Sequence, residues 1–341
     1  MTPLPGRSRG VVIIVALTLL LLFSIVAGVS LGAVRIAPAE VIDAIGRALA
    51  GEGRGLADAV IIDLRLPRVL LAALVGASLA LAGVLYQALF RNPLADPYIL
   101  GVSSGAGLGA TLALALLGTS YLARAAGVPA GAFAGATLTM LLVVRLATRR
   151  GRLDSTSLLL AGVAISYTLA ALTSFIMVFE RESMATIVFW MMGGLQRASW
   201  AYVAVLAGMF LAGAAIPALY HRELDLMLMG DERAGQLGVS VERFKLLALG
   251  SASLVVAGAV SVSGLIGFVG LMMPHMVRLV IGPQHRLLVP ASVLAGASVL
   301  VLADLLARVI LAPMEIPVGI ITALAGGPFF VWLLVRKERV R

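Results

Sequence analysis

The sequence predicts an all-α polytopic membrane protein, with about ten transmembrane helices and both termini on the cytoplasmic side. Hydrophobic residues make up 61% of its 341 residues and charged residues only 13%, a composition that a soluble domain of this length does not need. The apolar residues form runs near the ~20 residues that a helix needs to cross ~30 Å of hydrocarbon. We therefore treat residues 1–341 as a single transmembrane domain.

Ten apolar segments run along the chain, and we expect each to be one membrane span. They lie at 11–31, 69–89, 98–117, 129–147, 157–178, 200–219, 244–263, 265–281, 288–307 and 316–335. The first follows Arg7 and Arg9 and resembles a signal peptide. It is long for a signal core and further spans follow, so we expect it to remain as a helix. The eighth is short and rich in glycine, which favours an irregular span.

The distribution of Lys and Arg sets the orientation. Ten spans place both termini on one side, and the loops on that side carry 17 of the 26 basic residues, against nine in the opposite loops. Acidic residues divide almost evenly, eight against nine, and contribute little to orientation. The termini and the loop at 221–245 are therefore predicted to be cytoplasmic. The net charge of +9 follows from this topology and does not indicate a nucleic-acid partner.

Glycines at four-residue spacing predict close helix packing. They form two series, Gly101, Gly105, Gly109 and Gly127, Gly131, Gly135. Small residues at this spacing let helix backbones approach each other in lipid. A glycine-rich run can also hold phosphate, but the two lysines of the chain do not follow glycine, so it has no Gly-Lys-Ser/Thr element for binding ATP.

The few ionisable residues within the spans argue against proton transfer or catalysis inside the membrane. Asp304 and Arg308 lie four residues apart, which favours a local ion pair, and His275 stands alone in its span. A proton relay would need a chain of such groups. The sequence has no cysteine and no cluster with metal-ligand spacing, and its serine clusters lack a nearby His and Asp. A secondary transporter and a membrane-embedded enzyme are therefore disfavoured, and we expect no cofactor and no metal on this chain.

The segment His221–Lys245 is charged, unlike most of the chain. It carries 9 of the chain's 43 charged residues, 26 basic and 17 acidic in all. It keeps an apolar rhythm at Leu224, Met227, Leu228, Ala234 and Leu237. Gly230 and Asp231 can begin a short helix there, and Gly238 can end it. The pattern is typical of a docking surface for a soluble partner, and the alternative is a solvated loop.

The polar joints between the spans lie, in order, at Leu64–Arg68, Tyr86–Gly107, Asp154–Ser166, Trp190–Gly194, Gly230–Ser240, Gly264–Leu279, His285–Arg308 and Glu315–Leu334. Together these joints closely resemble those of the FecCD-type permeases, the membrane subunits of type II ATP-binding-cassette (ABC) importers. The resemblance covers about residues 10–336.

The resemblance implies a transport assembly in the cytoplasmic (inner) membrane of a bacterium or archaeon. Two permease copies would work with two ABC ATPase subunits, which hold ATP and Mg²⁺, and with a periplasmic or lipid-anchored binding protein. It also implies that 221–245 forms the helices that dock on the ATPase. The coupling residues are then Leu224, Met227, Leu228, Gly230, Asp231, Glu232, Ala234, Leu237 and Gly238.

The resemblance implies two further sites. Arg65, Arg68 and Arg308 match positions that receive acidic residues of the binding protein on the outer side. The alternative is anchoring at the membrane interface for Arg65 and Arg68, and the pair with Asp304 for Arg308. A cytoplasmic gate is implied at Asn92, Leu94, Ser155, Thr156 and Ser157. Small hydroxyl residues after an aspartate are also ordinary helix caps, and both interpretations of 155–157 can hold together.

The cargo is the least determined property. The resemblance allows a ferric siderophore, haem or cobalamin, and we rank the siderophore first because that class is the broadest. The pathway is predicted to be lined by small and apolar residues, with Met191 and Met192 as candidates. Such a lining favours a bulky chelate over a bare metal ion.

Overall fold

The computed structural model describes residues 7–338 apart from 33, 52–54, 118–119, 150 and 181. Its architecture is all-α, as predicted. Within the described part of the chain, the only strands are β1 (Thr148–Arg149) and β2 (Arg152–Leu153), which form an antiparallel hairpin.

Ten helices lie on the ten predicted segments. They are α1 (Arg7–Ser30), α4 (Leu66–Leu89), α5 (Val102–Leu116), α6 (Tyr121–Ala147), α7 (Ser155–Phe179), α9 (Trp200–Leu219), α12 (Val241–Ser263), α13 (Val269–Ile281), α14 (His285–Val309) and α15 (Val318–Glu338). Of the described helical stretches, 7 are long and apolar enough to cross a membrane, while those of α5, α13 and α15 are shorter apolar helices. The protein is therefore a multi-pass membrane protein.

The second span begins earlier than predicted. The short helix α3 (Leu56–Ala59) and the π-helix η1 (Val60–Arg65) run directly into α4, which makes one stretch of 34 residues. The charges at Asp63, Arg65 and Arg68 hid this extension from a hydropathy argument. Pro67 lies directly after the π-helix and does not end the stretch.

Four further short helices lie between the spans: α2 (Pro38–Ala50), α8 (Met184–Met191), α10 (His221–Met227) and α11 (Asp231–Gln236). The sequence analysis missed α2 and α8. The ends of α2 are marked by ordinary signals, a proline in its first turn and Gly51 in the left-handed region with φ 71°. It went unnoticed because it is too short and too polar to be a span.

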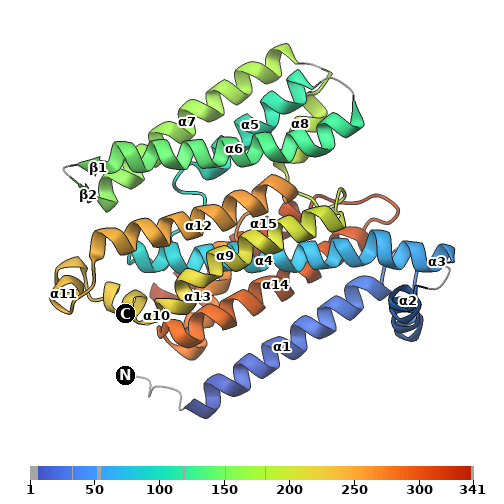
Figure 1. Ribbon diagram of the computed structural model, residues 1–341, viewed down its shortest axis with the longest axis horizontal. Helices are drawn as coiled ribbons and strands as arrows, with labels where there is room; N and C mark the ends of the chain where they lie inside the picture. The colour runs from blue at the N-terminus through green and yellow to red at the C-terminus, as the bar shows by residue number, and fades with distance from the viewer. Residues whose placement is uncertain are drawn as a thin grey trace.

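The helices form two layers (Figure 1). One layer holds α5, α6 and α7, and the other holds α4, α9, α12, α13, α14 and α15, with α1 packed on the outside of α14. Both termini lie at the same end as α10, α11 and the β-hairpin, which we call the terminal end. The other end, which carries α2 and α3, is the distal end. Helix α4 is the centre of its layer, since every residue from Val75 to Leu89 is buried.

Glycines bring the helices together as predicted. A Cβ on Gly109 would collide with the carbonyl oxygen of Gly131, and one on Gly105 with that of Gly135, so α5 and α6 touch along their backbones. The first member of each glycine series differs. Gly101 has φ 80° at the start of α5, and Gly127 packs on the side chain of Leu117.

The eighth span is irregular, as its sequence predicted. Helix α13 begins only at Val269, and Gly264 and Phe268, which precede it, both have positive φ, at 68° and 69°. Backbone polar groups at membrane depth must find partners inside the protein. Tyr98 supplies them, because its hydroxyl donates to the Ile266 carbonyl at 3.0 Å and accepts from the Ile266 N–H at 3.2 Å.

Candidate functional site

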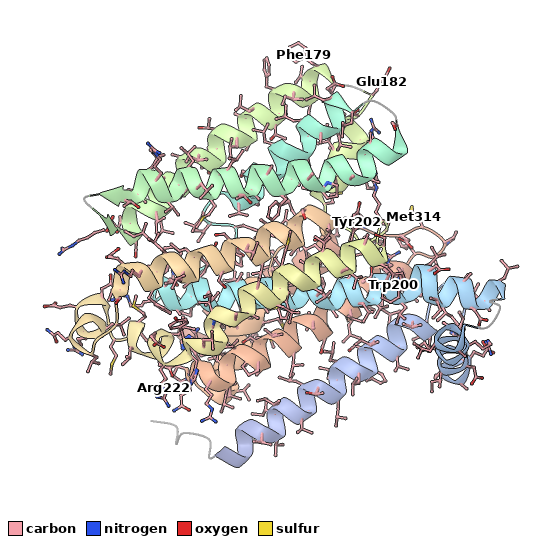
Figure 2. The ribbon with its side chains drawn as sticks, viewed as in Figure 1. Phe179, Glu182, Trp200, Tyr202, Arg222 and Met314 are labelled. Carbon is pink, nitrogen blue, oxygen red and sulfur yellow. The ribbon has the colours of Figure 1, made fainter. Side chains whose placement is uncertain are left out.

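The predicted coupling segment, residues 221–245, contains the two short helices α10 and α11 at the terminal end (Figure 1). Gly230, with φ 104°, precedes α11, and Gly238, with φ 90°, follows it, where the sequence placed the start and the end of a helix. Glu232, Leu237 and Gly238 are exposed, and Leu228, Gly230 and Asp231 are half-buried. The exposed surface of α11 is therefore mainly polar. Figure 2 shows Arg222 at this same end, pointing away from the helices.

The expectation of an exposed apolar face is wrong for three of the coupling residues. Leu224, Met227 and Ala234 have no exposed surface. They belong to the main hydrophobic core, together with residues of α4 and α12. Apolar side chains spaced along a charged segment can be covered either by a partner or by the protein's own core, and sequence spacing alone does not distinguish the two. These three side chains fix α10 and α11 to the membrane helices.

Asp231, the first residue of α11, makes two ion pairs. Its carboxylate contacts Lys245 of α12, and its Oδ1 accepts from Nη2 of Arg91 at 3.3 Å. Lys245 is only 4% exposed, and its Nζ also lies 3.4 Å from the carbonyl oxygen of Leu153. Arg91 and Asp231 are half-exposed. The sequence analysis named Asp231 but gave no partner for it.

The second predicted gate segment, Ser155–Ser157, forms the first turn of α7. Asp154 caps this helix, since its Oδ2 accepts from the Ser157 N–H at 2.7 Å. Hydrogen bonds from the Ser157 side chain and backbone lower the pKa of Asp154, and the charge of Lys245 adds a smaller effect in the same direction. Thr156 is exposed, while Ser155 and Ser157 are half-buried. The cap interpretation is confirmed, and it leaves Thr156 free at the surface of the single chain.

The first predicted gate segment follows α4. Asn92 accepts from the Leu94 N–H at 2.9 Å and so forms a local turn, and both side chains are exposed. Arg91, just before it, has φ 48°, which is uncommon for a residue with a side chain and costs of order 1–3 kcal/mol. Further along, the joint packs against α7, since a Cβ on Gly162 would lie 2.7 Å from the Ile99 carbonyl oxygen. The structure thus places both segments at the terminal end and joins the first to α7.

A separate contact ties α10 to α14. Oδ1 of Asp225 accepts from the backbone N–H of His285 at 2.9 Å and lies 2.7 Å from its Nδ1. Burial alone would raise the pKa of Asp225, but the hydrogen bonds and charge of His285 outweigh it, so the pKa is lowered overall. The contact anchors the coupling segment at the start of a second membrane helix.

The three arginines predicted to dock the binding protein lie at the distal end and line a cavity there. Arg308 donates to Asp304 at 3.0 Å and to the Gly28 carbonyl at 2.8 Å, and Arg68 donates to Asp304 at 3.0 Å. Arg68 also pairs with Glu315 at 2.9 Å. The Arg68 and Arg308 side chains are only 12% and 8% exposed. The alternative of a pair between Arg308 and Asp304 is confirmed, and the docking role stays a prediction.

Arg65 is also engaged within the chain. Its guanidinium donates to the carbonyl oxygens of Val29 at 2.7 Å and Ser30 at 3.3 Å, near the end of α1. A guanidinium fills this role well because its donors form a fixed fork and always carry charge. Arg65 therefore joins the end of α1 to the end of η1, just before α4.

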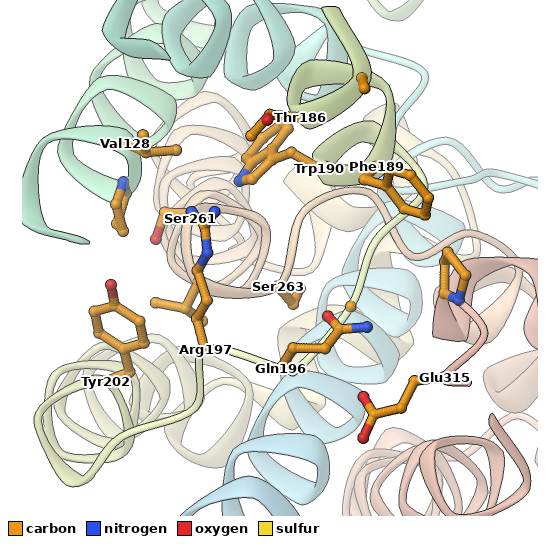
Figure 3. A pocket seen from close by; sticks show the side chains of 15 residues that line it. Val128, Thr186, Phe189, Trp190, Gln196, Arg197, Tyr202, Ser261, Ser263 and Glu315 are labelled. Atoms are coloured by element: carbon orange, nitrogen blue, oxygen red, sulfur yellow. The ribbon is translucent and has the colours of Figure 1, made fainter. Parts of the chain in front are cut away.

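Two cavities open at the distal end, and the sequence analysis foresaw neither. The larger measures about 470 Å³ and the smaller about 300 Å³, and Gln196 and Glu315 line both. In Figure 3, Tyr202 and Glu315 lie on opposite sides of the larger cavity, with Arg197 and Gln196 between them. Among the described residues, no group of three His, Cys, Asp or Glu could hold a metal ion.

Aromatic residues frame this end. Trp200 opens α9 and donates from Nε1 to the Ile62 carbonyl at 3.0 Å, and the Tyr202 hydroxyl donates to the Ala125 carbonyl. Figure 2 shows both residues at the same end of the molecule as Met314. They tie α9 to η1 and to α6 beside the cavities, and Trp and Tyr are enriched where helices leave the hydrocarbon.

Comparison with known proteins places these features in context. Residues 20–336 match the model of the FecCD transport family. The cobalamin import system permease protein BtuC of Halobacterium salinarum is 46% identical over 282 residues, which cover 83% of this chain and 75% of the relative. The Fe(3+) dicitrate transport system permease protein FecD of Escherichia coli is 42% identical over 279 residues, or 82% and 86% of the two chains.

Further relatives agree with this match. The hemin transport system permease protein HmuU of Yersinia pestis is 40% identical over 282 residues, or 82% of this chain and 84% of the relative. A solved structure of a metal-chelate type ABC transporter, in an inward-facing conformation, superimposes with a TM-score of 0.82 at 32% identity. That superposition covers 95% of this chain and 99% of the other.

Proposed function

The chain belongs to the FecCD transport family, and we propose that it carries a ferric siderophore inward, as the permease subunit of an ABC importer. The coarser assignment, a permease of an importer for metal chelates, follows from the family match and from the relatives that cover most of the chain. Transport by such a subunit makes and breaks no covalent bond, so ATP hydrolysis belongs to a separate ATPase.

One observation carries the mechanism. The short helices α10 and α11 lie at the terminal end, together with the two segments that the sequence analysis assigned to the gate. If this end faces the cytoplasm, as the distribution of basic residues predicts, an ATPase on α11 would act directly beside the gate. Alternating access needs a rigid element that transmits the movement of the ATPase to the gate, and α11 would be that element.

The cargo is argued from the larger distal cavity. Arg197, Gln196 and Trp190 give it N–H donors, while Val128, Phe189 and Pro317 give it apolar walls. Donors suit the carbonyl and carboxylate oxygens at the surface of a ferric chelate, and a volume of about 470 Å³ is within the usual range for small-molecule sites. The relatives at 40–46% identity are named for cobalamin, hemin and ferric dicitrate, so haem and cobalamin stay as alternatives.

The proposed assembly contains two copies of this chain, two ATPase subunits and a binding protein that delivers the chelate at the distal end. Docking there would use Arg65, Arg68 and Arg308, which line the smaller distal cavity, together with Arg197, which is exposed at this end. The gate would form where Thr156 of one copy meets Thr156 of the second.

Uptake into proteoliposomes tests the function. The permease is reconstituted with its ATPase and binding protein, and ferric siderophore, haem and cobalamin are offered separately, with and without ATP inside. ATP-dependent uptake of the siderophore supports the proposal. Uptake of haem or cobalamin alone would replace the cargo. Accumulation driven by a proton gradient without ATP would instead indicate a secondary transporter.

Cross-linking tests the dimeric gate. The chain has no cysteine, so Thr156→Cys introduces a single thiol, and a disulfide needs Cα atoms within about 7 Å. We expect a cross-linked dimer in at least one nucleotide state, with uptake blocked and ATPase binding kept. If Thr156→Cys and Ser157→Cys both fail to cross-link in every state, residues 155–157 serve only as the capped start of α7.

A further inference from the structure

We propose that Asp231 is the branching point through which α11 moves both gate segments, with Lys245 and Arg91 as its two arms. We call these three residues the Asp231 junction. The inference rests on the proposed function and names the side chains that would transmit the motion. It is carried by ion pairs that join elements far apart in sequence, since Arg91 lies 140 residues before Asp231.

The first arm runs from Asp231 through Lys245 to the β-hairpin. The Lys245 ammonium is buried and donates to the Asp231 carboxylate and the Leu153 carbonyl oxygen. A buried ammonium needs its partners, because losing one leaves an uncompensated charge away from water. Lys245 is therefore fixed between α11 and Leu153, so a shift of Asp231 must either move Lys245 or leave its charge unpaired.

The β-hairpin connects Lys245 to the start of α7. Both backbone groups of Leu153 are held by α12, because its N–H donates to Glu242 at 2.7 Å and its carbonyl oxygen lies near Lys245. The next residue, Asp154, caps α7. One residue thus separates the anchored strand from the helix that begins with Ser155, and a displacement at Leu153 reaches Thr156 within a single helical turn.

The second arm runs from Asp231 through Arg91 to the joint after α4. Nη1 of Arg91 also lies against Gly230, since a Cβ there would be 3.1 Å from it. The Arg91 backbone has φ 48°, a conformation that persists only when its surroundings hold it. Backbone hydrogen bonds at the end of α4 supply that constraint, from the Arg91 N–H to Ala88 and from the Asn92 N–H to Gln87, both at 3.2 Å. The Arg91 side chain links this cap to Gly230 and Asp231, so a movement of α11 would pull on the cap and on the turn that Asn92 forms.

The two arms differ in strength. The Lys245 side chain is 5% exposed, whereas those of Arg91 and Asp231 are 41% and 39% exposed. Exposed pairs are weak and screened by salt, while a buried cation retains its partner. The Lys245 arm is therefore a firm connection to α7, and the Arg91 arm is a releasable one to the joint after α4.

Spin-label distances test the junction without an ATPase or a cargo. Cysteines are placed at exposed positions on α11 and on each gate segment, Glu232 with Thr156 and Glu232 with Leu94, in the purified chain in lipid nanodiscs. We expect narrow distance distributions for both pairs. Lys245→Met should broaden only the 232–156 distribution, Arg91→Met only the 232–94 distribution, and Asp231→Asn both. The matched controls Arg243→Met and Arg233→Met remove exposed charges from α12 and α11 and should change neither.

A conservative variant makes the test independent of simple loss of folding. Lys245→Arg combined with Arg91→Met keeps a buried cation that can donate both to Asp231 and to the Leu153 carbonyl, but it removes the exposed arm. The 232–156 distribution should stay narrow while the 232–94 distribution broadens. If this variant and the single variants all keep both distributions narrow, or if both distributions change together in every variant, the branching role is wrong.

A coupling measurement in the reconstituted importer separates this inference from the proposed function. Lys245→Met should raise the ATP hydrolysed per chelate imported at least tenfold, with ATPase binding unchanged, and Lys245→Arg should restore most of the coupling. If the wild-type chain imports no chelate, the proposed function fails, whereas the nanodisc distances still report on the junction. Tight coupling in Lys245→Met would overturn the inference alone.

Discussion

Each end of the molecule holds a carboxylate between two basic side chains, and the two arrangements differ in burial. At the distal end, Asp304 lies between Arg68 and Arg308, and its side chain is 1% exposed. At the terminal end, Asp231 lies between Lys245 and Arg91 and is 39% exposed. The same chemistry therefore serves two purposes. A fully buried carboxylate fixes helices in one arrangement, while a half-exposed one can exchange its partners with water and so can take part in a movement.

The partners lead to the same conclusion. Asp304 and Arg308 both belong to α14, and Arg68 lies on α4, which packs along α14 with Gly76 against Gly296. The distal cluster thus closes a contact between two helices that already touch. Asp231 instead connects a short surface helix with a loop and with α12. Four substitutions test this contrast, from the largest expected effect to the smallest.

Asp304→Ala should be the most damaging. It leaves the Arg68 and Arg308 guanidiniums without their shared carboxylate, and breaking a buried ion pair costs about 3–5 kcal/mol. We expect a much lower melting temperature of the purified protein in detergent and little folded protein in the membrane. Asp43→Ala, at an exposed position on α2, is the control. Wild-type melting of Asp304→Ala would show that the distal cluster does not hold α4 and α14 together.

Asp231→Ala should cost less stability and more function. Lys245 loses its carboxylate but keeps the Leu153 carbonyl, and water can reach the half-exposed site, so we expect about 1–3 kcal/mol of destabilisation. Thermal unfolding and ATP-driven uptake are measured on the same preparation, with Arg233→Ala, at an exposed position on α11, as the control. Destabilisation equal to that of Asp304→Ala would remove the proposed difference between the two ends.

Asp225→Asn should alter the pH dependence of stability. Because the pKa of Asp225 is lowered in the folded protein, the carboxylate stabilises it above the ordinary aspartate pKa of ~4, and the effect is lost as the pH falls through the lowered value. The side chain is 38% exposed, which limits the effect to below about 1 kcal/mol. Unfolding is followed from pH 7 to pH 3. Identical pH profiles for the two proteins would mean that the Asp225–His285 contact contributes nothing to folding.

Arg91→Ala should have the smallest effect on stability, about 0.2–1 kcal/mol, because its pair with Asp231 is exposed. High salt should remove this difference by screening the wild-type pair. Arg68→Ala is the matched comparison, since its buried pair should respond little to salt. If the two substitutions show the same salt dependence, burial does not separate the two clusters.

Much of the fold was accessible from the sequence because each membrane span is specified locally. A run of about twenty apolar residues predicts a membrane span whatever it packs against, and the glycine spacing predicts the close contact of α5 and α6. The pair of Asp304 and Arg308 was also readable, because residues four apart on a helix are neighbours. The irregular start of α13 was predicted from its glycines.

The site was less accessible because its contacts join distant residues. Arg68 lies 236 positions from Asp304, and no local pattern reveals that the two share a buried pair. For the same reason the sequence did not show that Arg68, like Arg308, is paired within the chain. Leu224, Met227 and Ala234 were placed on a docking face, since sequence spacing shows that a helix has an apolar side but not which body covers it.

The break in the eighth span bears on how the protein is made. Tyr98, the residue that bonds to the N–H and the carbonyl of Ile266, lies 168 positions earlier in the chain. During synthesis the tyrosine therefore enters the bilayer long before the peptide that needs it. When the unwound stretch before α13 leaves the insertion machinery, its hydrogen-bond partner is already in place. The order of the chain thus lets a helix with a polar gap be built into lipid without that gap having to face hydrocarbon alone.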